Sequence, residues 1–440
     1  MKFGTAGTRG RKGQNIMHIR LKYGEEGLDL EFPETSNFVG VLYPQEAEVI
    51  PVPEDAVQQS LLRPIESEPL KALGRDKTDA VIVISDITRP VPNALLLPII
   101  IQHLEAAGIP SAKITILIAT GIHRPNEGKE LERLVGKEIA SSYRIINHFS
   151  KNQDDMVLVG HIGNGVPALV NKHYLAADLK ILTGFIEPHM WAGFSGGRKS
   201  ILPGISSVKT LEFMHGPEMV AHPQTRYGIL KGNPFHEAGL DIMEQAGADF
   251  IVNVTLDTSK KITGVFAGHP VKAHLEGVEF LSRHCVQTLD EPLDFVVTTN
   301  AGAPLDCNLY QTAKGISGVA GATREGGVIL IATECLEGFG SEEYRAVFEH
   351  ATTPQAFIEK LMKKEFFLPD QWCAQETYQV MLKKEIWVHT QGIDSDTLKR
   401  FHFKPVKKIN EAIEELLDRF GPDARWAIVP DGPLLILKVD

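Results

Sequence analysis

Residues 80–124 decide the fold, and they read AVIVISDITRPVPNALLLPIIIQHLEAAGIPSAKITILIATGIHR. The β-branched, apolar run Ala80–Ser85 predicts a short buried strand. Residues 93–107 carry apolar side chains at helical spacing, and Gly108-Ile-Pro110 ends the predicted helix. Residues 113–119 predict a second strand. A strand, a helix and a strand in succession indicate a parallel βαβ unit.

The alternation continues beyond this unit and is repeated later in the chain. Further strands are predicted over 180–183, 250–256, 294–299 and 327–333, and helices over 310–322, 342–350 and 354–363. We therefore predict an α/β fold of two α/β domains with mainly parallel sheets and the active site in the cleft between them. The boundary is expected near residue 290, which gives domains 17–290 and 291–440 after a mobile leader, 1–16.

Composition limits the classes of function. The 440 residues are 43% hydrophobic and 23% charged, as in a globular protein of two or three domains. The formal charge of −11 argues against nucleic acid as a partner. No apolar run reaches the roughly 20 residues of a membrane span, and residues 1–16 lack the apolar core of a signal peptide. The four cysteines show no CxxC spacing, which argues against a zinc knuckle. So few cysteines in a large chain fit a reducing cytoplasm better than a disulfide-bonded secreted protein.

Polar residues stand where the predicted strands end. The segments are Asp86-Ile87-Thr88-Arg89, Thr120-Gly-Ile-His123-Arg124 and Glu187-Pro-His189. In open α/β sheets this edge is where ligands bind. Thr88 and Arg89 suit a phosphate or carboxylate, and His123 suits acid–base chemistry near neutral pH. Taken alone, the first segment is better explained by a helix cap with a salt bridge, because Asp and Thr are favoured caps, and a loop hydrogen bond is the alternative for His123.

A glycine-rich stretch follows, and residues 184–204 read GFIEPHMWAGFSGGRKSILPG. Backbone at Gly196 and Gly197 can approach a phosphate closely. Arg198 occupies the place where a Walker A loop needs glycine, so the spacing excludes that motif. Lys199, in apolar and glycine-rich surroundings, can act as a nucleophile or as a cation that neutralises a phosphate.

His215 follows a helix predicted over 208–214. A neutral imidazole at this position can bind a metal, whereas an imidazolium there interacts with the helix dipole. No pair of histidines in this region has the HExxH spacing of zinc hydrolases.

In the second predicted domain, Tyr310-Gln-Thr-Ala-Lys314 opens a helix. Gln311 and Lys314 are three residues apart, so they share one helical face. That face can hold a carboxylate if it borders a cleft, or it can be solvated. Trp372 forms either an apolar wall of a site or part of the core.

Taken together, these segments resemble the lactate racemase family. The resemblance rests on the order and spacing of several motifs between residues 80 and 375, each of them weak alone. These are Ser85-Asp-Ile-Thr-Arg-Pro90, Thr120-Gly-Ile-His-Arg124, Glu187-Pro-His189, Gly193-Phe-Ser-Gly-Gly-Arg-Lys199, His215 and Tyr310-Gln-Thr-Ala-Lys314.

The resemblance implies a cofactor, the nickel-pincer nucleotide, in which nickel is bound by sulfur, carbon and sulfur of a pyridinium mononucleotide. It implies a covalent link to Lys199 and His215 as the fourth nickel ligand, a chemically reasonable set for nickel. Residues 17–290 would then be the cofactor-binding domain. Asp86, Ile87, Thr88 and Arg89, together with Gly196 and Gly197, would contact the nucleotide. Separate cofactor-making enzymes would load it, so that recombinant protein can lack it.

The resemblance further implies a racemase or epimerase of a 2-hydroxy acid. His123 and His189 would be the acid–base residues on the two faces of the substrate carbon. Hydride would leave to the pincer ring and return to the other face of a transient 2-keto acid. The substrate contacts would come from Arg89, Tyr310, Gln311, Lys314 and Trp372.

Two other classes of function remain alternatives. One is a nucleotide-dependent transferase that uses residues 193–199 as a phosphate loop, against which Arg198 counts. The other is a non-catalytic protein that binds a small anion, which leaves the histidines and Lys199 without a shared purpose. An enzyme that uses free NAD would need a GxGxxG turn, and residues 85–93 contain no glycine.

Overall fold

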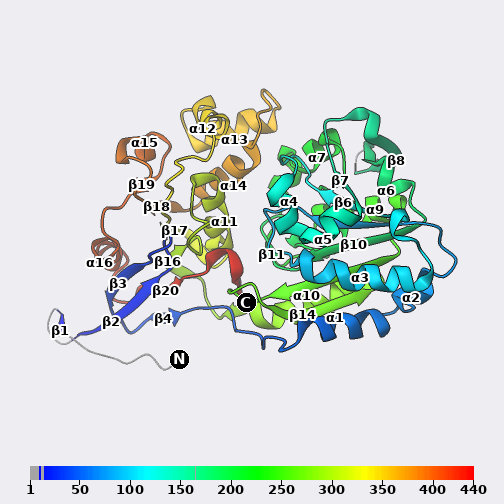
Figure 1. Ribbon diagram of the computed structural model, residues 1–440. Helices are drawn as coiled ribbons and strands as arrows, with labels where there is room; N and C mark the ends of the chain where they lie inside the picture. The colour runs from blue at the N-terminus through cyan, green and yellow to red at the C-terminus, as the bar shows by residue number, and fades with distance from the viewer. Residues whose placement is uncertain (1–8, 11–13, 164) are drawn as a thin grey trace. The chain divides into compact units, whose positions relative to one another are not determined.

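The computed structural model describes residues 9–10, 14–163 and 165–440. It forms two compact units. The middle unit is continuous over Glu46–His284, and the outer unit combines the described residues up to Gln45 with Cys285–Asp440 (Figure 1). No helix in the described part of the chain is long and apolar enough to cross a membrane.

The prediction of a single domain over 17–290 is wrong at its N-terminal end. Strand β4 (Phe38–Val41) pairs in parallel with β20 (Trp426–Val429), so the residues before Glu46 belong to the C-terminal sheet. The sequence could not show this, because pairing partners far apart in the chain leave no periodic pattern. The second boundary, expected near 290, lies between His284 and Cys285.

Most of the leader predicted over 1–16 lies outside the described residues. Of the remainder, Arg9–Gly10 forms β1, and β2 (Gln14–Leu21) begins before Met17 and pairs antiparallel with β3 (Leu28–Pro33). Leu21, Leu30 and Phe32 of this hairpin are buried in the core of the outer unit, where Phe32 contacts Trp426 edge-on at 5.6 Å. Burial of these side chains is what fixes the hairpin to this unit.

The sheet of the middle unit has the strand order β14-β13-β10-β5-β6-β7. Its strands are β5 (Ala80–Ser85), β6 (Ile114–Ala119), β7 (Arg144–Asn147), β10 (Leu179–Phe185), β13 (Phe250–Leu256) and β14 (Ile262–Gly268). All neighbours are parallel except β13 and β14. The parallel α/β prediction is confirmed, whereas the antiparallel edge strand β14 was not predicted.

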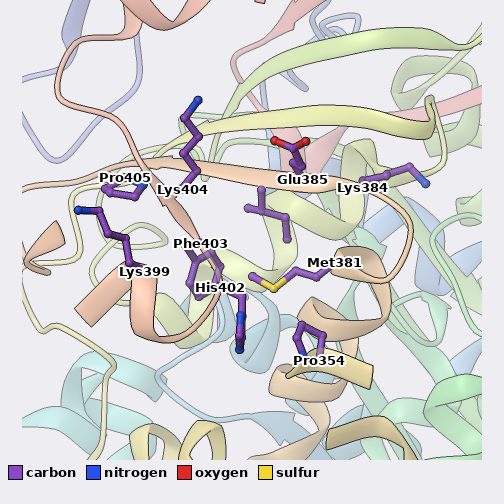
Figure 2. Close-up of a pocket in the computed structure, with 10 residues that line it drawn as sticks. Pro354, Met381, Lys384, Glu385, Lys399, His402, Phe403, Lys404 and Pro405 are labelled. Atoms are coloured by element: carbon purple, nitrogen blue, oxygen red, sulfur yellow. The ribbon is translucent and has the colours of Figure 1, made fainter. Parts of the chain in front are cut away.

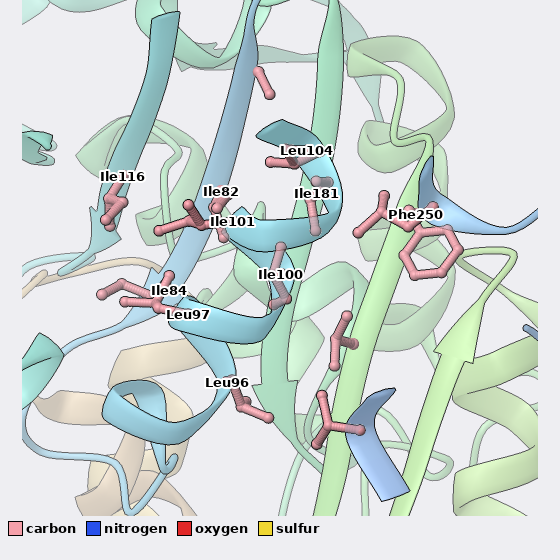
Figure 3. Close-up of a cluster of buried hydrophobic side chains, with 14 of the residues drawn as sticks. Ile82, Ile84, Leu96, Leu97, Ile100, Ile101, Leu104, Ile116, Ile181 and Phe250 are labelled. Carbon is pink, nitrogen blue, oxygen red and sulfur yellow. The ribbon is translucent and has the colours of Figure 1, made fainter. Parts of the chain in front are cut away.

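Helices alternate with many of the strands of the middle unit along the chain. They are α1 (Pro53–Leu62), α2 (Leu70–Leu73), α3 (Asn93–Ala107), α4 (Gly128–Val135), α5 (Lys137–Ser142), α6 (Lys172–Leu175), α7 (Val208–Met214), α8 (Pro217–Ala221), α9 (Pro234–Ala246) and α10 (Lys272–Cys285). Figure 3 shows the apolar face of α3 against the sheet: Leu96, Leu97, Ile100, Ile101 and Leu104 meet Ile82, Ile84, Ile116, Ile181 and Phe250. Strand β5 is buried along five of its six residues, which is why it reads as a continuous apolar run.

Two small hairpins complete the middle unit. Strands β8 (Met156–Ile162) and β9 (Val166–Asn171) pair antiparallel, and so do β11 (Pro188–His189) and β12 (Gly193–Phe194). The second hairpin folds the glycine-rich stretch back on itself. It ends at a short 3-10 helix, η4 (Gly197–Ser200), which contains Lys199.

The outer unit has a second parallel sheet, of order β19-β18-β17-β16-β20-β4. Its other strands are β16 (Leu293–Thr299), β17 (Thr323–Ala332), β18 (Glu385–His389) and β19 (Lys404–Pro405), and β15 (Val286–Leu289) pairs separately with β21 (Ile436–Val439). The helices are α11 (Leu309–Ala320), α12 (Glu342–Val347), α13 (Pro354–Met362), α14 (Gln371–Met381), α15 (Ser395–Arg400) and α16 (Ile409–Phe420).

Candidate active site

Three loops leave the middle sheet at one edge. Strands β10, β5 and β6 are parallel neighbours, so their carboxyl ends lie side by side. The loops that follow them contain Glu187–His189, Asp86–Arg89 and Thr120–Arg124, respectively. The topology thus gathers the predicted residues of this unit at the edge where α/β sheets bind ligands.

Asp86 and His123 form a dyad between two of these loops. Nδ1 of His123 lies 2.7 Å from Oδ2 of Asp86, and Asp86 is 2% exposed. Oδ1 of Asp86 accepts hydrogen bonds from the Thr88 hydroxyl at 2.6 Å and the Thr88 backbone N–H at 3.2 Å. Burial raises the pKa of Asp86, but the hydrogen bonds from His123 and Thr88 outweigh burial and lower the pKa below its ordinary value.

The dyad determines which nitrogen of His123 holds the proton. An ionised carboxylate only accepts hydrogen bonds, so Nδ1 of His123 donates and the lone pair of the neutral ring is on Nε2. The ring is half exposed, with 43% of its side-chain surface accessible. His123 is therefore oriented as a base that can take a proton at Nε2.

Asn126 connects the same two loops, and the sequence analysis missed it. It is 1% exposed, and its Oδ1 accepts from the Ile87 N–H at 3.2 Å. Its own N–H donates to Oδ1 of Asn147 at 2.9 Å. No sequence pattern separates such an asparagine from ordinary loop asparagines. Thr88 and Arg89 are exposed at this edge, where a ligand can reach them.

His189 lies on β11, and its ring is held by the turn that follows. Nδ1 of His189 accepts hydrogen bonds from the backbone N–H groups of Trp191 and Ala192, both at 3.2 Å. The Trp191 ring is close to the His189 ring, at 6.1 Å between centroids, and to the His215 ring, at 5.3 Å. Trp191 thus connects the two predicted histidines, a role the sequence did not reveal.

The glycines before Lys199 allow close packing. Gly196 and Gly197 have φ of +83° and +53°, and the Gly197 N–H donates to Oδ1 of Asn253 at 2.8 Å. A Cβ at Gly196 would lie 2.7 Å from that same oxygen. The Lys199 N–H is also used, since it donates to the Gly196 carbonyl at 3.2 Å. Two N–H groups that a phosphate loop would offer to its ligand are thus engaged within the protein, which counts against the transferase alternative.

His215 follows α7 in an apolar environment. Its Nδ1 lies 2.9 Å from the Leu211 carbonyl, so Nδ1 donates and the lone pair is on Nε2. The ring meets Trp191 and Phe235 edge-on, at centroid distances of 5.3 and 5.6 Å. Burial, with a smaller contribution from the charge of Lys199, lowers the pKa of His215 to about 4. The imidazole is therefore neutral at physiological pH, the form that binds metals.

In the outer unit, helices α11 and α14 bring Tyr310 and Trp372 together. The Trp372 indole N–H donates to the Tyr310 hydroxyl at 3.2 Å. Asn308 caps α11 by accepting from the Gln311 N–H at 3.0 Å. Oε1 of Gln311 is buried and accepts no hydrogen bond within the described residues. Lys314 is half buried one turn further along the helix.

A pocket of about 460 Å³ lies elsewhere in the outer unit, at the start of β18. Its lining includes Pro354, Met381 and His402, together with three lysines (Figure 2). The side chains of Lys384, Lys399 and Lys404 point in different directions rather than toward one centre. None of the predicted site residues lines this pocket, so we do not assign the active site to it.

The two halves of the sequence match the lactate racemase N-terminal domain, over residues 23–228, and the lactate racemase C-terminal domain, over residues 289–437. A lactate racemase of Thermoanaerobacterium thermosaccharolyticum is 36% identical over 428 residues, which are 96% of this chain and 100% of that protein. The chain belongs to the lactate racemase family. As a member of this family it is an isomerase that acts as a racemase.

Three further comparisons agree with this family or with its fold. A lactate racemase of Lactiplantibacillus plantarum is 36% identical over 388 residues, or 88% of this chain and 91% of that protein. The structure of the lactate racemase apoprotein from T. thermosaccharolyticum superposes with a TM-score of 0.89 at 35% identity, covering 96% of this chain and 100% of that one. A Thermotoga maritima structure shares the fold, with a TM-score of 0.66 at 19% identity over 90% of this chain and 100% of that one.

Proposed function

We propose that this family member racemises or epimerises a small 2-hydroxy acid in the cytoplasm by reversible hydride transfer through a 2-keto acid, using a nickel-pincer nucleotide. The observation that carries the proposal is the Asp86–His123 dyad. It places a base with a defined lone pair at the same sheet edge as the loop that leads to His189 and Lys199. Removal of the hydroxyl proton by such a base is what hydride loss from a 2-hydroxy acid requires.

The residues present fit the cofactor. His215 is neutral with its lone pair on Nε2, as a nickel ligand requires, and the Trp191 ring packs edge-on against it. The charge of Lys199 contributes to the lowered pKa of His215, which supports a site that uses the amine for the link to the nucleotide and the imidazole for its nickel. Asp86–Arg89 would contact the nucleotide, and Gly196 and Gly197 would contact it through backbone atoms other than the Gly197 N–H, which donates to Asn253. When bound, the nucleotide would supply a hydride acceptor.

The chain's own residues would move the protons and hold the substrate. His123 would take the hydroxyl proton at Nε2, and Asp86 would stabilise the imidazolium that forms. His189 would act at the hydroxyl of the opposite enantiomer. Arg89, Gln311 and Lys314 would bind the substrate carboxylate while the keto acid turns. Tyr310 and Trp372, already hydrogen bonded to each other, would form a wall of the substrate site.

Lactate is the first substrate to test, because it is the substrate named for the relatives. Other aliphatic or aromatic 2-hydroxy acids, malate and sugar acids belong in the same screen, as single enantiomers. Formation of the opposite enantiomer without added NAD would support the proposal.

The cofactor is tested first by intact mass and nickel content, on protein produced together with the cofactor-making enzymes. We expect an added mass of nucleotide size and near-stoichiometric nickel, both lost in Lys199→Ala. Lys209→Ala, an exposed lysine of α7, is the matched control and should load normally. Unmodified, nickel-free protein from cells that load another family member would refute the proposal and favour the transferase or the anion-binding alternative.

A further inference from the structure

The buried Arg198 has no role in the proposed chemistry, although it lies directly before Lys199. Its side chain is 1% exposed. No salt bridge to its guanidinium is found within the part of the chain that the structure describes. Burial lowers the pKa of Arg198 to about 9, so the group is still charged at neutral pH. A buried cation without an anion is costly, and a fold that keeps one must gain something from its hydrogen bonds.

Most of the hydrogen bonds of Arg198 are directed at its own loop, and one further contact joins its Nη1 to Nε2 of His274 in α10, at 3.0 Å. Nη2 donates to the carbonyls of Ala192 and Phe194, at 2.8 and 3.0 Å, and Nη1 donates to the carbonyl of Gly196 at 3.3 Å. Three alternate carbonyls of the segment are thus turned toward one planar group. The β11–β12 hairpin is folded around this guanidinium.

The same segment fixes the ring of His189. The N–H groups of Trp191 and Ala192 point at Nδ1 of His189, and the carbonyl of Ala192 accepts from Arg198. Two N–H donors at Nδ1 are compatible only with an unprotonated Nδ1. The neutral ring of His189 therefore has its proton on Nε2. His123 has the opposite arrangement, because Asp86 holds the proton on Nδ1.

We propose that Arg198 is a positioning residue that shapes the 189–197 turn so that its backbone N–H groups hold His189 in the Nε2–H tautomer. His189 then begins the reaction as a hydrogen-bond donor to a substrate oxygen, whereas His123 begins it as a base. Before His189 can take a proton at Nε2, its ring proton must move to Nδ1, and this requires the N–H groups of Trp191 and Ala192 to move away from Nδ1. Only this statement of roles depends on the proposed function.

The tautomers can be read directly from ¹⁵N-histidine NMR spectra of the full-length chain without cofactor. His189→Gln and His123→Gln assign the two sets of signals. We expect the chemical shifts of His189 to show an unprotonated Nδ1 and a protonated Nε2, and those of His123 to show the reverse. A protonated Nδ1 on His189 in the unaltered chain would overturn the proposal.

Variants test the part played by Arg198. Arg198→Met should abolish the tautomer preference of His189 and leave His123 unchanged, and Arg198→Lys should restore the preference in part. Gly239→Ala is a second variant, in case Arg198→Met does not fold. Its added Cβ would lie 2.6 Å from Cγ of Arg198 and displace that side chain, while the guanidinium N–H donors of Arg198 are kept. It too should weaken the preference.

Arg283→Met, at an exposed arginine paired with Glu279, is the matched control and should change neither histidine. An unchanged His189 tautomer in folded Arg198→Met or in Gly239→Ala would refute the positioning role. These spectra need no turnover, so a loaded protein without racemase activity would contradict the proposed function and leave this inference intact.

Discussion

Replacing Asp86 by asparagine should disable His123 without removing it. The carboxylate has two tasks: Oδ2 accepts from His123, and Oδ1 accepts from the Thr88 N–H. An amide has one acceptor and one donor group. If the amide oxygen faces Thr88, the NH₂ group faces His123 and moves the ring proton to Nε2. If the oxygen faces His123, the amide NH₂ group faces the Thr88 backbone N–H, and because both are donors the hydrogen bond between them is lost.

The expected loss in rate follows from the hydrogen bond that is removed. A hydrogen bond to a charged group contributes about 1.5–3 kcal/mol. That corresponds to a decrease in kcat of roughly 10- to 150-fold. The assay is the interconversion of single enantiomers of the best 2-hydroxy acid by loaded protein, followed by chiral chromatography, with KM determined separately.

The control is Asp394→Asn, because Asp394 also accepts from a threonine hydroxyl and backbone N–H, at 2.7 and 2.9 Å, but in the outer unit. It should leave kcat unchanged. A decrease in kcat smaller than threefold for Asp86→Asn, in protein that loads nickel normally, would contradict the role assigned to the dyad.

Three further predictions concern stability and the outer unit. Burial lowers the pKa of His148 to about 4. The unfolded chain therefore takes up a proton at this residue before the folded chain does, and the free energy of unfolding should fall by about 1.4 kcal/mol per pH unit as the pH drops from about 6.5 to 4. Urea titrations should show a weaker pH dependence of the free energy of unfolding in His148→Gln, and an unchanged dependence would disprove this. Gly193→Ala places a Cβ 2.2 Å from the Ile229 carbonyl oxygen at a φ of +74° and should cost about 2–4 kcal/mol. Gly338→Ala, at a φ of +60° in open space, should cost about 1 kcal/mol, and equal losses of thermal stability would be inconsistent with a steric cause. Tyr310→Phe removes the hydroxyl that accepts from the Trp372 N–H and should destabilise the outer unit by about 1 kcal/mol. It should also raise KM for the 2-hydroxy acid, and an unchanged KM would exclude Tyr310 from the substrate site.

The strand and helix pattern of the middle of the chain could be predicted because each element has its own periodicity. Residues 80–85 and 93–107 match β5 and α3 to the residue. The position of the candidate residues after strand ends also follows, since parallel strands end at one edge. What sequence alone could not supply was contact between segments far apart in the chain. The pairing of β4 with β20 and the hydrogen bond from Ile87 to Asn126 are of that kind.

Arg198 shows a different limit. In the sequence it counted only as the residue that breaks a Walker A motif. Its burial and its carbonyl partners depend on the hairpin that folds around it. His236 is a similar case, because its ring is buried in α9 at 6% exposure, and only the packing of that helix makes it so. Pro234, which ends many helices when it stands inside them, here opens α9 two residues before His236.

The pairing of β4 with β20 has a consequence for biosynthesis. Strand β4 leaves the ribosome long before its neighbour β20 is synthesised. The indole N–H of Trp426 donates a hydrogen bond to the Thr35 hydroxyl, 391 positions earlier in the sequence. Until Trp426 has been synthesised, Phe32 and Phe38 lack the indole ring that both of them contact in the folded unit. The continuous middle unit can meanwhile fold, whereas the outer unit must wait for nearly the whole chain. A chain that ends before β20 would therefore expose the apolar side chains of its N-terminal strands and be prone to aggregate, so the outer unit can fold only when synthesis is almost complete.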